Sequence, residues 1–172
     1  MSPLAKGLVI AAAQVALAAS VGAKFLYDRS NYPRVWAETA PYDPDLPIRG
    51  RYVRIAVLVE PARAPARDGG ELADMYMAYL DVFNDRLYAV EDENGRNWVT
   101  KRRCGEADCW QLANALAFFI PEHAVDPSRR PAGETLWVEV TVPPTGPPRP
   151  LQLGVKREGD AEVTPLEVRK AD

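Results

Sequence analysis

Apolar and polar residues alternate along several short stretches of this chain. The clearest alternation runs from Tyr52 to Glu60, where valine or isoleucine occupies every second position from Val53 onward. A second runs from Leu136 to Val142 and stops at two prolines. A period of two places alternate side chains on one face of a strand. These stretches therefore predict strands with one buried face.

Turn signals divide the remainder into further short strands. Asn84-Asp85 lies between Met75–Phe83 and residues 87–90 and predicts a two-residue hairpin, and residues 92–95 predict a second turn. The stretch from Trp110 to Ile120 fits a helix or a strand, and its aromatic end before a proline favours a strand. Additional strands are expected within residues 32–40, 98–99, 151–155 and 163–168. The sequence predicts a mainly β fold, as a compact β-barrel or β-sandwich.

One apolar stretch near the N-terminus is continuous rather than alternating. No charged residue lies between Lys6 and Lys24, and a helix over that stretch would span about 26 Å at ~1.5 Å per residue. Extended through Tyr27, it approaches the ~20 residues that cross a bilayer. A cleavable signal peptide is the alternative, with small-residue sites at 16–18 and 21–23. A buried helix of a soluble protein is the third. The first two export the rest of the chain, and Lys6 favours an N-in orientation.

The chain is accordingly divided into four parts. Residues 1–27 are expected to form the transmembrane anchor or signal peptide, and residues 28–50 an extended proline-rich arm. Residues 51–168 form the exported β-domain, and residues 169–172 a tail. The 16 prolines of the 172-residue chain disfavour long helices after the N-terminus. The formal net charge of −3 provides no basic patch for nucleic acid.

Two cysteines, Cys104 and Cys109, are the only ones in the chain, and a glycine lies between them. This spacing permits a small disulfide-closed loop, which persists in oxidising compartments. Free thiols and a redox or metal role are the alternatives. A thioredoxin-type pair has two intervening residues rather than four, and a zinc site needs about four ligands. We therefore expect a structural disulfide, and neither a metal nor a cofactor.

A proline-rich segment before the first long strand resembles a known family signature. Pro41-Tyr42-Asp43-Pro44-Asp45-Leu46-Pro47-Ile48-Arg49-Gly50-Arg51-Tyr52-Val53 is similar to the motif of the GDYXXLXY family, small bacterial membrane-anchored proteins of unknown function. Phe118-Phe119-Ile120-Pro121-Glu122-His123-Ala124 resembles a later Phe-x-x-Pro-Glu element of that family. The chain departs from the signature at three positions, where it has Arg51, Ile55 and Val57.

The resemblance implies a location and a kind of partner rather than a reaction. It implies a single-pass protein of the bacterial inner (cytoplasmic) membrane, with its C-terminal domain outside the cytoplasm. Members are often encoded beside polytopic membrane proteins, which implies such a protein as the partner. A role of the motif aspartate in chemistry is not carried over, because Arg51 replaces it.

The two motif blocks also contain the candidate site residues. Arg49, Arg51 and Arg54 form a candidate anion- or carboxylate-binding patch, since arginine presents bidentate donors; the alternative is a solvated ion-pair network. Gly50 and Tyr52 join Arg49 and Arg51 as candidate binding residues. Glu122 and His123 are a candidate acid–base pair, whose alternative is an ordinary loop pair. The exported region has only two serines, Ser30 and Ser128, and no Gly-x-Ser-x-Gly turn. No residue is predicted as catalytic.

We therefore expect a noncatalytic envelope module that binds or regulates a membrane protein partner. The alternative is an exported hydrolase or ligand-binding enzyme that uses the regions around Arg49/Arg51 and Glu122/His123. The ligand of either is unknown from the sequence. The tryptophans are expected to be core anchors, and a shared aromatic face for sugar binding is the alternative. They are Trp36, Trp98, Trp110 and Trp137.

Overall fold

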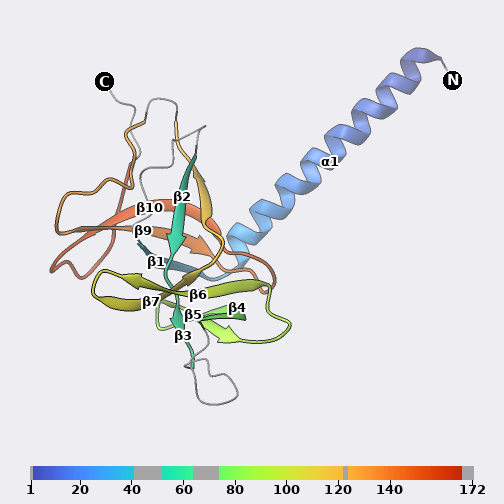
Figure 1. The fold of residues 1–172 in the computed structure, drawn as a ribbon. Coiled ribbons are helices and arrows are strands. Elements are labelled where there is room, and N and C mark those ends of the chain that lie inside the picture. The colour runs from blue at the N-terminus through green and yellow to red at the C-terminus, as the bar shows by residue number, and fades with distance from the viewer. Residues whose placement is uncertain (1, 41–51, 64–73, 122–123, 168–172) are drawn as a thin grey trace. The chain divides into compact units, whose positions relative to one another are not determined.

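The computed structural model describes residues 2–40, 52–63, 74–121 and 124–167. The chain forms two compact units, residues 1–32 and 33–172, and each is described by itself. The first is a single helix and the second is built from strands (Figure 1). The predicted fold class, mainly β after one N-terminal helix, is confirmed.

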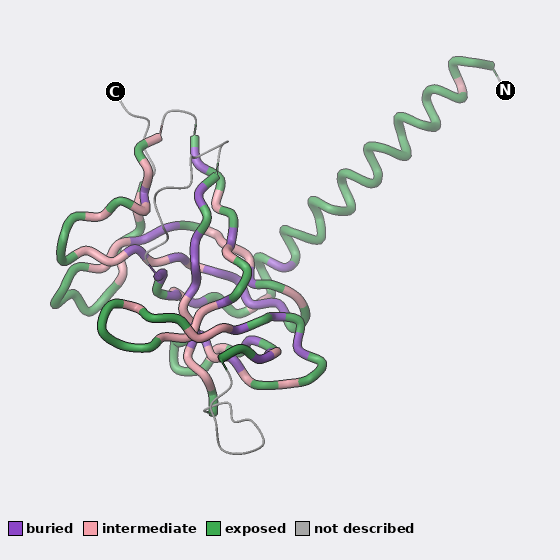
Figure 2. Tube along the Cα trace, in the orientation of Figure 1, coloured by how far each residue is buried: buried purple, intermediate pink, exposed green. Residues whose placement is uncertain are grey.

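Helix α1 (Pro3–Asn31) has local signals at both ends. The Ser2 hydroxyl accepts a hydrogen bond from the Ala5 backbone N–H (3.3 Å), and proline occupies the first helical position. Tyr32 is extended because it precedes Pro33. The helix is long and apolar enough to cross a membrane and is exposed along almost all of its length (Figure 2). It extends to Asn31, beyond the end predicted at residue 27.

The strands of the second unit form two sheets. Their separation fits a sandwich-like fold rather than a closed barrel, within the described residues. The six-stranded sheet has the order β11 (Thr164–Pro165), β10 (Arg149–Arg157), β9 (Glu134–Thr141), β1 (Arg34–Ala40), β2 (Tyr52–Val57), β8 (Leu116–Phe119). The five-stranded sheet has the order β3 (Glu60–Pro61), β5 (Arg86–Glu91), β4 (Met75–Phe83), β6 (Asn97–Cys104), β7 (Ala107–Leu112).

Alternate residues of the central strands make the core. β1 buries Val35 and Ala37, and its antiparallel neighbour β9 buries Val138 and Val140. The one polar group on this face of β1, the buried Thr39 hydroxyl, donates to the Leu136 carbonyl (2.8 Å), so it is not left unpaired. In Figure 2 the buried stretches follow the strands of both sheets. The side chains on the opposite face of β1 and β9 are therefore not part of the core.

The chain passes between the sheets at residues 58–59. The Leu58 N–H donates to the Glu38 carbonyl of β1, and the Val59 N–H donates to the Trp110 carbonyl of β7, both at 2.9 Å. The alternating stretch from Tyr52 to Glu60, predicted as one strand, is thus divided: β2 belongs to one sheet and β3 to the other (Figure 1). This crossing ties β1 and β7 together.

The local predictions differ in outcome. The hairpin at Asn84-Asp85 is confirmed, since both residues have positive φ (49° and 57°) and join β4 to β5. The stretch from Trp110 to Ile120 contains strand rather than helix. The prediction that it forms one strand is wrong, because its residues belong to β7 and β8, which lie in different sheets. The last strand covers only Thr164–Pro165 of the predicted 163–168, and residue 168 lies outside the described residues.

The predicted arm at residues 28–50 also requires correction. Residues 28–31 are the end of α1, and residues 34–40 form β1 inside the six-stranded sheet. β1 pairs with β9 along five residues, which is why it is a strand of the domain rather than a lead-in to it. The β-domain therefore begins at Pro33 instead of residue 51. Residues 41–50 of the predicted arm lie outside the described residues.

Candidate functional site

Of the candidate residues in the two motif blocks, only Tyr52 lies within the described residues. Tyr52 is the first residue of β2 and is partly exposed, whereas Arg49, Gly50, Arg51, Glu122 and His123 lie outside the described residues. Tyr52 is paired with Phe119 of β8, and their rings meet edge to face with centroids 6.3 Å apart. The described ends of both motif blocks thus lie at the same end of the β2–β8 ladder.

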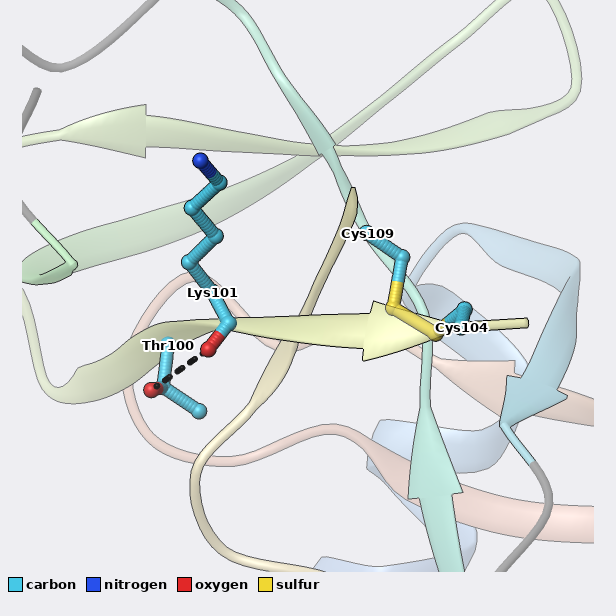
Figure 3. The surroundings of a disulfide bond; sticks show 4 residues. All are labelled: Thr100, Lys101, Cys104 and Cys109. Carbon is cyan, nitrogen blue, oxygen red and sulfur yellow. Dashed lines mark hydrogen bonds between the residues drawn. A yellow bond between two sulfur atoms is a disulfide. The ribbon is translucent and has the colours of Figure 1, made fainter. Parts of the chain in front are cut away.

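The predicted disulfide is present. Cys104, the last residue of β6, is bonded to Cys109 of β7, with the two Cα atoms 5.7 Å apart (Figure 3). The turn between them contains Gly105 with φ 69°, in the left-handed region that glycine adopts readily. On the chain-entropy view, so short a loop stabilises the fold by about 2 kcal/mol. No group of three or more potential metal ligands occurs within the described residues.

An ion pair lies beside the disulfide. The Lys101 ammonium of β6 contacts the Asp108 carboxylate of β7 at 2.7 Å. The hydrogen bond and the charge of Asp108 raise the pKa of Lys101. This pair joins the same two strands as the disulfide. Both features therefore hold β7 against β6.

The β-domain has a groove with a volume of about 890 Å³. Three of the four tryptophans line it, each half-buried: Trp36 of β1, Trp137 of β9 and Trp110 of β7. One wall is the face of the six-stranded sheet that points away from the core. The other is built by the crossing at 58–61, the β4–β5 hairpin and β7. Of the tryptophans expected in the core, Trp110 packs partly against it. Trp36 and Trp137 face the groove, and Trp98 is exposed.

Two tryptophans and two glutamates form a regular array on the sheet wall. Trp36 is directly opposite Glu139, and Glu38 is directly opposite Trp137, in the antiparallel β1–β9 ladder. Directly opposite residues have Cβ atoms about 5 Å apart. All four side chains share one face, because they alternate with buried Val35, Ala37 and Val138. We call Trp36, Glu38, Trp137 and Glu139 the Trp-Glu square.

The position of Trp36 depends on a glycine in β10. A Cβ at Gly154 would lie 2.7 and 2.9 Å from two Trp36 ring carbons and 2.5 Å from a Val163 methyl carbon. These distances are shorter than real Cβ contacts, so only glycine leaves room for the indole to lie against β10. The Val163 side chain lies against the same position of β10. The Trp36 ring is therefore packed closely against β10 while it lines the groove.

Trp137 interacts with a cation of its own chain. The Lys156 ammonium lies over its ring, 5.4 Å from the centroid, within the ~6 Å range of a cation–π contact. The indole N–H of Trp137 is buried and has no hydrogen-bond acceptor among the described residues. Buried donors are normally paired. The Trp137 ring thus lines the groove, while its N–H is an unpaired donor buried away from solvent.

The charges of the groove are unbalanced. Glu60 is paired with Arg86 (2.6 Å) and Asp108 with Lys101 (2.7 Å). Neither Glu38 nor Glu139 forms a hydrogen bond or ion pair through its side chain with any described residue. Carboxylates outnumber basic groups in the lining. The carboxylates are Glu38, Glu60, Asp85, Asp108, Glu139 and Glu162, and the basic residues are Arg34, Arg86 and Lys156.

A second surface lies on the side of the five-stranded sheet that faces away from the core. Met75, Tyr79 and Phe83 of β4 are exposed at 51%, 42% and 63%. They alternate with buried Tyr76, Ala78 and Leu80. On neighbouring strands, Trp98 is directly opposite Met77, and Tyr88 is directly opposite Asp81. We call this surface, formed by Met75, Met77, Tyr79, Phe83, Tyr88 and Trp98, the outer aromatic face.

The Trp-Glu square has a signal in the sequence. Trp36-Ala37-Glu38 and Trp137-Val138-Glu139 are both Trp-x-Glu triplets. In strands, each triplet places its indole and carboxylate on the same face. The antiparallel pairing of the two triplets then alternates the residue types across the ladder. The triplets are about one hundred residues apart in sequence, so only the pairing brings them together.

The described geometry thus offers two surfaces with different chemistry. One is a recessed, acidic, tryptophan-lined groove, and the other is an open face of methionine and aromatic side chains that also carries exposed Asp81. Comparison of the chain with protein-family models, with curated proteins and with solved structures finds no match.

Proposed function

We propose that this protein is a membrane-anchored, noncatalytic module of the bacterial inner membrane that binds a membrane protein through its outer aromatic face. The proposal rests mainly on that face. It is centred on β4, the middle strand of the five-stranded sheet, and carries exposed methionine and aromatic side chains. Methionine and aromatic residues are enriched in the cores of protein interfaces, and contiguous apolar patches mark interaction sites.

The N-terminal helix supports a partner that lies in the membrane. α1 meets the length and hydropathy requirements for a bilayer span. Only Tyr32 and Pro33 separate it from β1, so an uncleaved helix keeps the β-domain close to the bilayer. This raises the effective concentration of the domain toward membrane proteins. The resemblance to the GDYXXLXY family, with its polytopic neighbours, agrees with the same partner class and with an exported C-terminal domain.

Position-specific photocrosslinking in intact membranes tests the proposal. A photoreactive residue at Tyr79 or Phe83 is expected to yield one discrete adduct with a membrane protein. The same probe at exposed Gln152 of β10 should not. Tyr79→Glu should abolish the Phe83 adduct, because it places a charge inside the interface. Identical adducts from Gln152, adducts with lipid only, or an adduct with a second copy of this chain would contradict the proposal.

One observation favours the second candidate, an exported hydrolase or ligand-binding enzyme at the motif blocks. Tyr52 follows Arg51 directly and is paired with Phe119, three positions before Glu122. The test is a screen of ester, peptide and phosphoester substrates with the parent chain and His123→Ala. A turnover that the variant loses would favour the enzyme. Equal background rates in both would exclude it for these substrates.

A further inference from the structure

We infer that the groove is a binding site for a small organic cation, an alkylammonium compound seated on the Trp-Glu square. The inference concerns a different surface from the outer aromatic face. It does not depend on the proposed membrane partner. It starts from the array of indoles and carboxylates and from the charge of the groove around it.

The cross-strand Trp–Glu pairs of the square do not stabilise one another. A carboxylate gains nothing from the face of an indole, because the π-system places negative charge there. Glu38 and Glu139 are diagonal neighbours in the ladder, so their like charges repel. Neither has a cationic partner among the described residues. A cation placed over the square would reduce this repulsion and contact both indoles.

The chain itself provides an example of the interaction. The Lys156 ammonium over Trp137 shows that the indole face accepts a cation at this place. Lys156 does not form an ion pair with either glutamate of the square within the described part of the chain. Lys156 therefore occupies the face of one indole, while the carboxylates of Glu38 and Glu139 have no cationic partner among the described residues. The ammonium group of a ligand would be a second cation, and it could pair with both carboxylates without competition from Lys156.

The groove also discriminates among ligand classes. The excess of carboxylates in its lining disfavours anions. A neutral sugar would stack on tryptophan but would not relieve the repulsion between Glu38 and Glu139. An alkylammonium group satisfies both the carboxylates and the indole faces of the Trp-Glu square.

The four tryptophans provide an internal control for the test. The full chain, labelled with ¹⁵N and held in an uncharged detergent, has four indole N–H signals, which single Trp→Phe variants assign. Choline chloride is titrated at constant ionic strength. The signals of Trp36 and Trp137 are expected to shift saturably, and the signal of Trp98, on the outer aromatic face, should stay in place. 3,3-Dimethylbutan-1-ol, which has the shape of choline without its charge, should cause no saturable shift.

Two charge variants sharpen the result. Glu38→Gln with Glu139→Gln keeps size and removes charge, and should weaken choline binding about tenfold. Lys156→Gln removes the competing cation and should tighten binding about threefold. An unchanged Trp98 signal confirms that each variant is folded. Equal shifts with the uncharged alcohol, shifts with glucose but not choline, or choline binding unaffected by the double variant would overturn the inference.

A free amine and a lipid headgroup share this chemistry, and bilayers distinguish them. The full chain is placed in nanodiscs of phosphatidylcholine or of phosphatidylglycerol, without choline. If the Trp36 and Trp137 signals already occupy their choline-bound positions only in phosphatidylcholine, the ligand is a headgroup. If they move in both bilayers only after choline is added, it is a free amine. If choline moves them in neither bilayer, the inference is wrong.

Discussion

The groove and the outer aromatic face both present tryptophan, but the neighbours of the indole differ. Trp36 and Trp137 lie opposite glutamates in the β1–β9 ladder, in a recess. Trp98 lies opposite Met77, on an open sheet surface where it is 44% exposed. The same residue type is thus placed for a small charged ligand in one sheet and for a broad apolar contact in the other. The residue across the strand from each tryptophan, rather than the tryptophan itself, determines which kind of contact the surface favours.

The two regions also differ in what maintains them. The groove depends on a glycine that accommodates side chains, since Gly154 faces the Trp36 ring and Val163. The five-stranded sheet depends on a glycine that accommodates backbone, because Gly95 lies against the main chain of Ala78 in β4. Side chains can rotate away from an intruding methyl group, whereas a paired strand cannot. Substitution at these glycines should therefore separate the two regions.

Gly95→Ala is expected to have the largest effect on stability. The new Cβ would lie 2.5, 2.6 and 2.7 Å from the carbonyl carbon, nitrogen and Cα of Ala78. β4 must shift to relieve this, which should lower the free energy of unfolding by about 3 kcal/mol. Urea denaturation of the detergent-held chain measures it, with Arg96→Ala at the next, exposed position as control. A loss no greater than that of the control would show that β4 moves freely.

Loss of the disulfide is expected to be the next largest effect. Cys104→Ser with Cys109→Ser should lower the free energy of unfolding by about 2 kcal/mol. Because Cys109 lines the groove and adjoins Trp110, the Trp110 indole signal should move more than that of Trp98. The parent chain in reductant should match the double variant, and the variant should not respond to reductant. A larger movement of Trp98 would place the effect on the outer aromatic face instead.

Gly154→Ala is expected to be milder and confined to the groove. The Trp36 ring and the Val163 side chain can turn away from the added methyl group, so we expect a loss of about 1 kcal/mol. The Trp36 indole signal should shift, and choline binding should weaken, while the Trp98 signal is retained. Equal shifts of Trp36 and Trp98 would show that the two regions are not separable in this way.

Features set by neighbours in the sequence are predictable from it, whereas features set by distant pairing are not. The Asn84-Asp85 hairpin and the Cys104–Cys109 disulfide depend on neighbours in sequence, and both were predicted correctly. The stretch from Tyr52 to Glu60 was predicted as one strand, because a period of two is the same whichever sheet the residues join. Its division arises from hydrogen bonds to Glu38 and Trp110, which are distant in sequence.

The candidate site was predictable in part for the same reason. Trp36 and Trp137 were recognised as notable residues, but core positions were expected because tryptophan is usually a buried anchor. Nothing local marks their partners Glu38 and Glu139 as a pair, since only the β1–β9 register brings them together. Register over so long a separation is set by tertiary pairing and not by local composition. The motif-block residues other than Tyr52 lie outside the described residues and stay a prediction.

Tyr76→Phe is expected to have the smallest effect at neutral pH and a distinct one in alkali. The Tyr76 hydroxyl is buried without a hydrogen-bond partner among the described residues, beside Trp110 of the groove wall. Removing an unpaired hydroxyl should leave stability unchanged or raise it by up to about 1 kcal/mol. Burial, and then the charge of Glu91, raise the pKa of Tyr76 to about 12 from 10.0.

The alkaline effect has a definite sign. Between pH 10 and pH 12, the native chain retains a proton on Tyr76 that the unfolded chain has lost, so stability falls as pH rises. Tyr76→Phe should remove part of this fall, and Lys101, whose pKa is also raised by Asp108, should preserve the remainder. Urea midpoints at pH 7, 10 and 11.5 measure both. An unchanged alkaline slope in Tyr76→Phe would mean that the hydroxyl is hydrated in the native state, and that the wall between the core and the groove admits water.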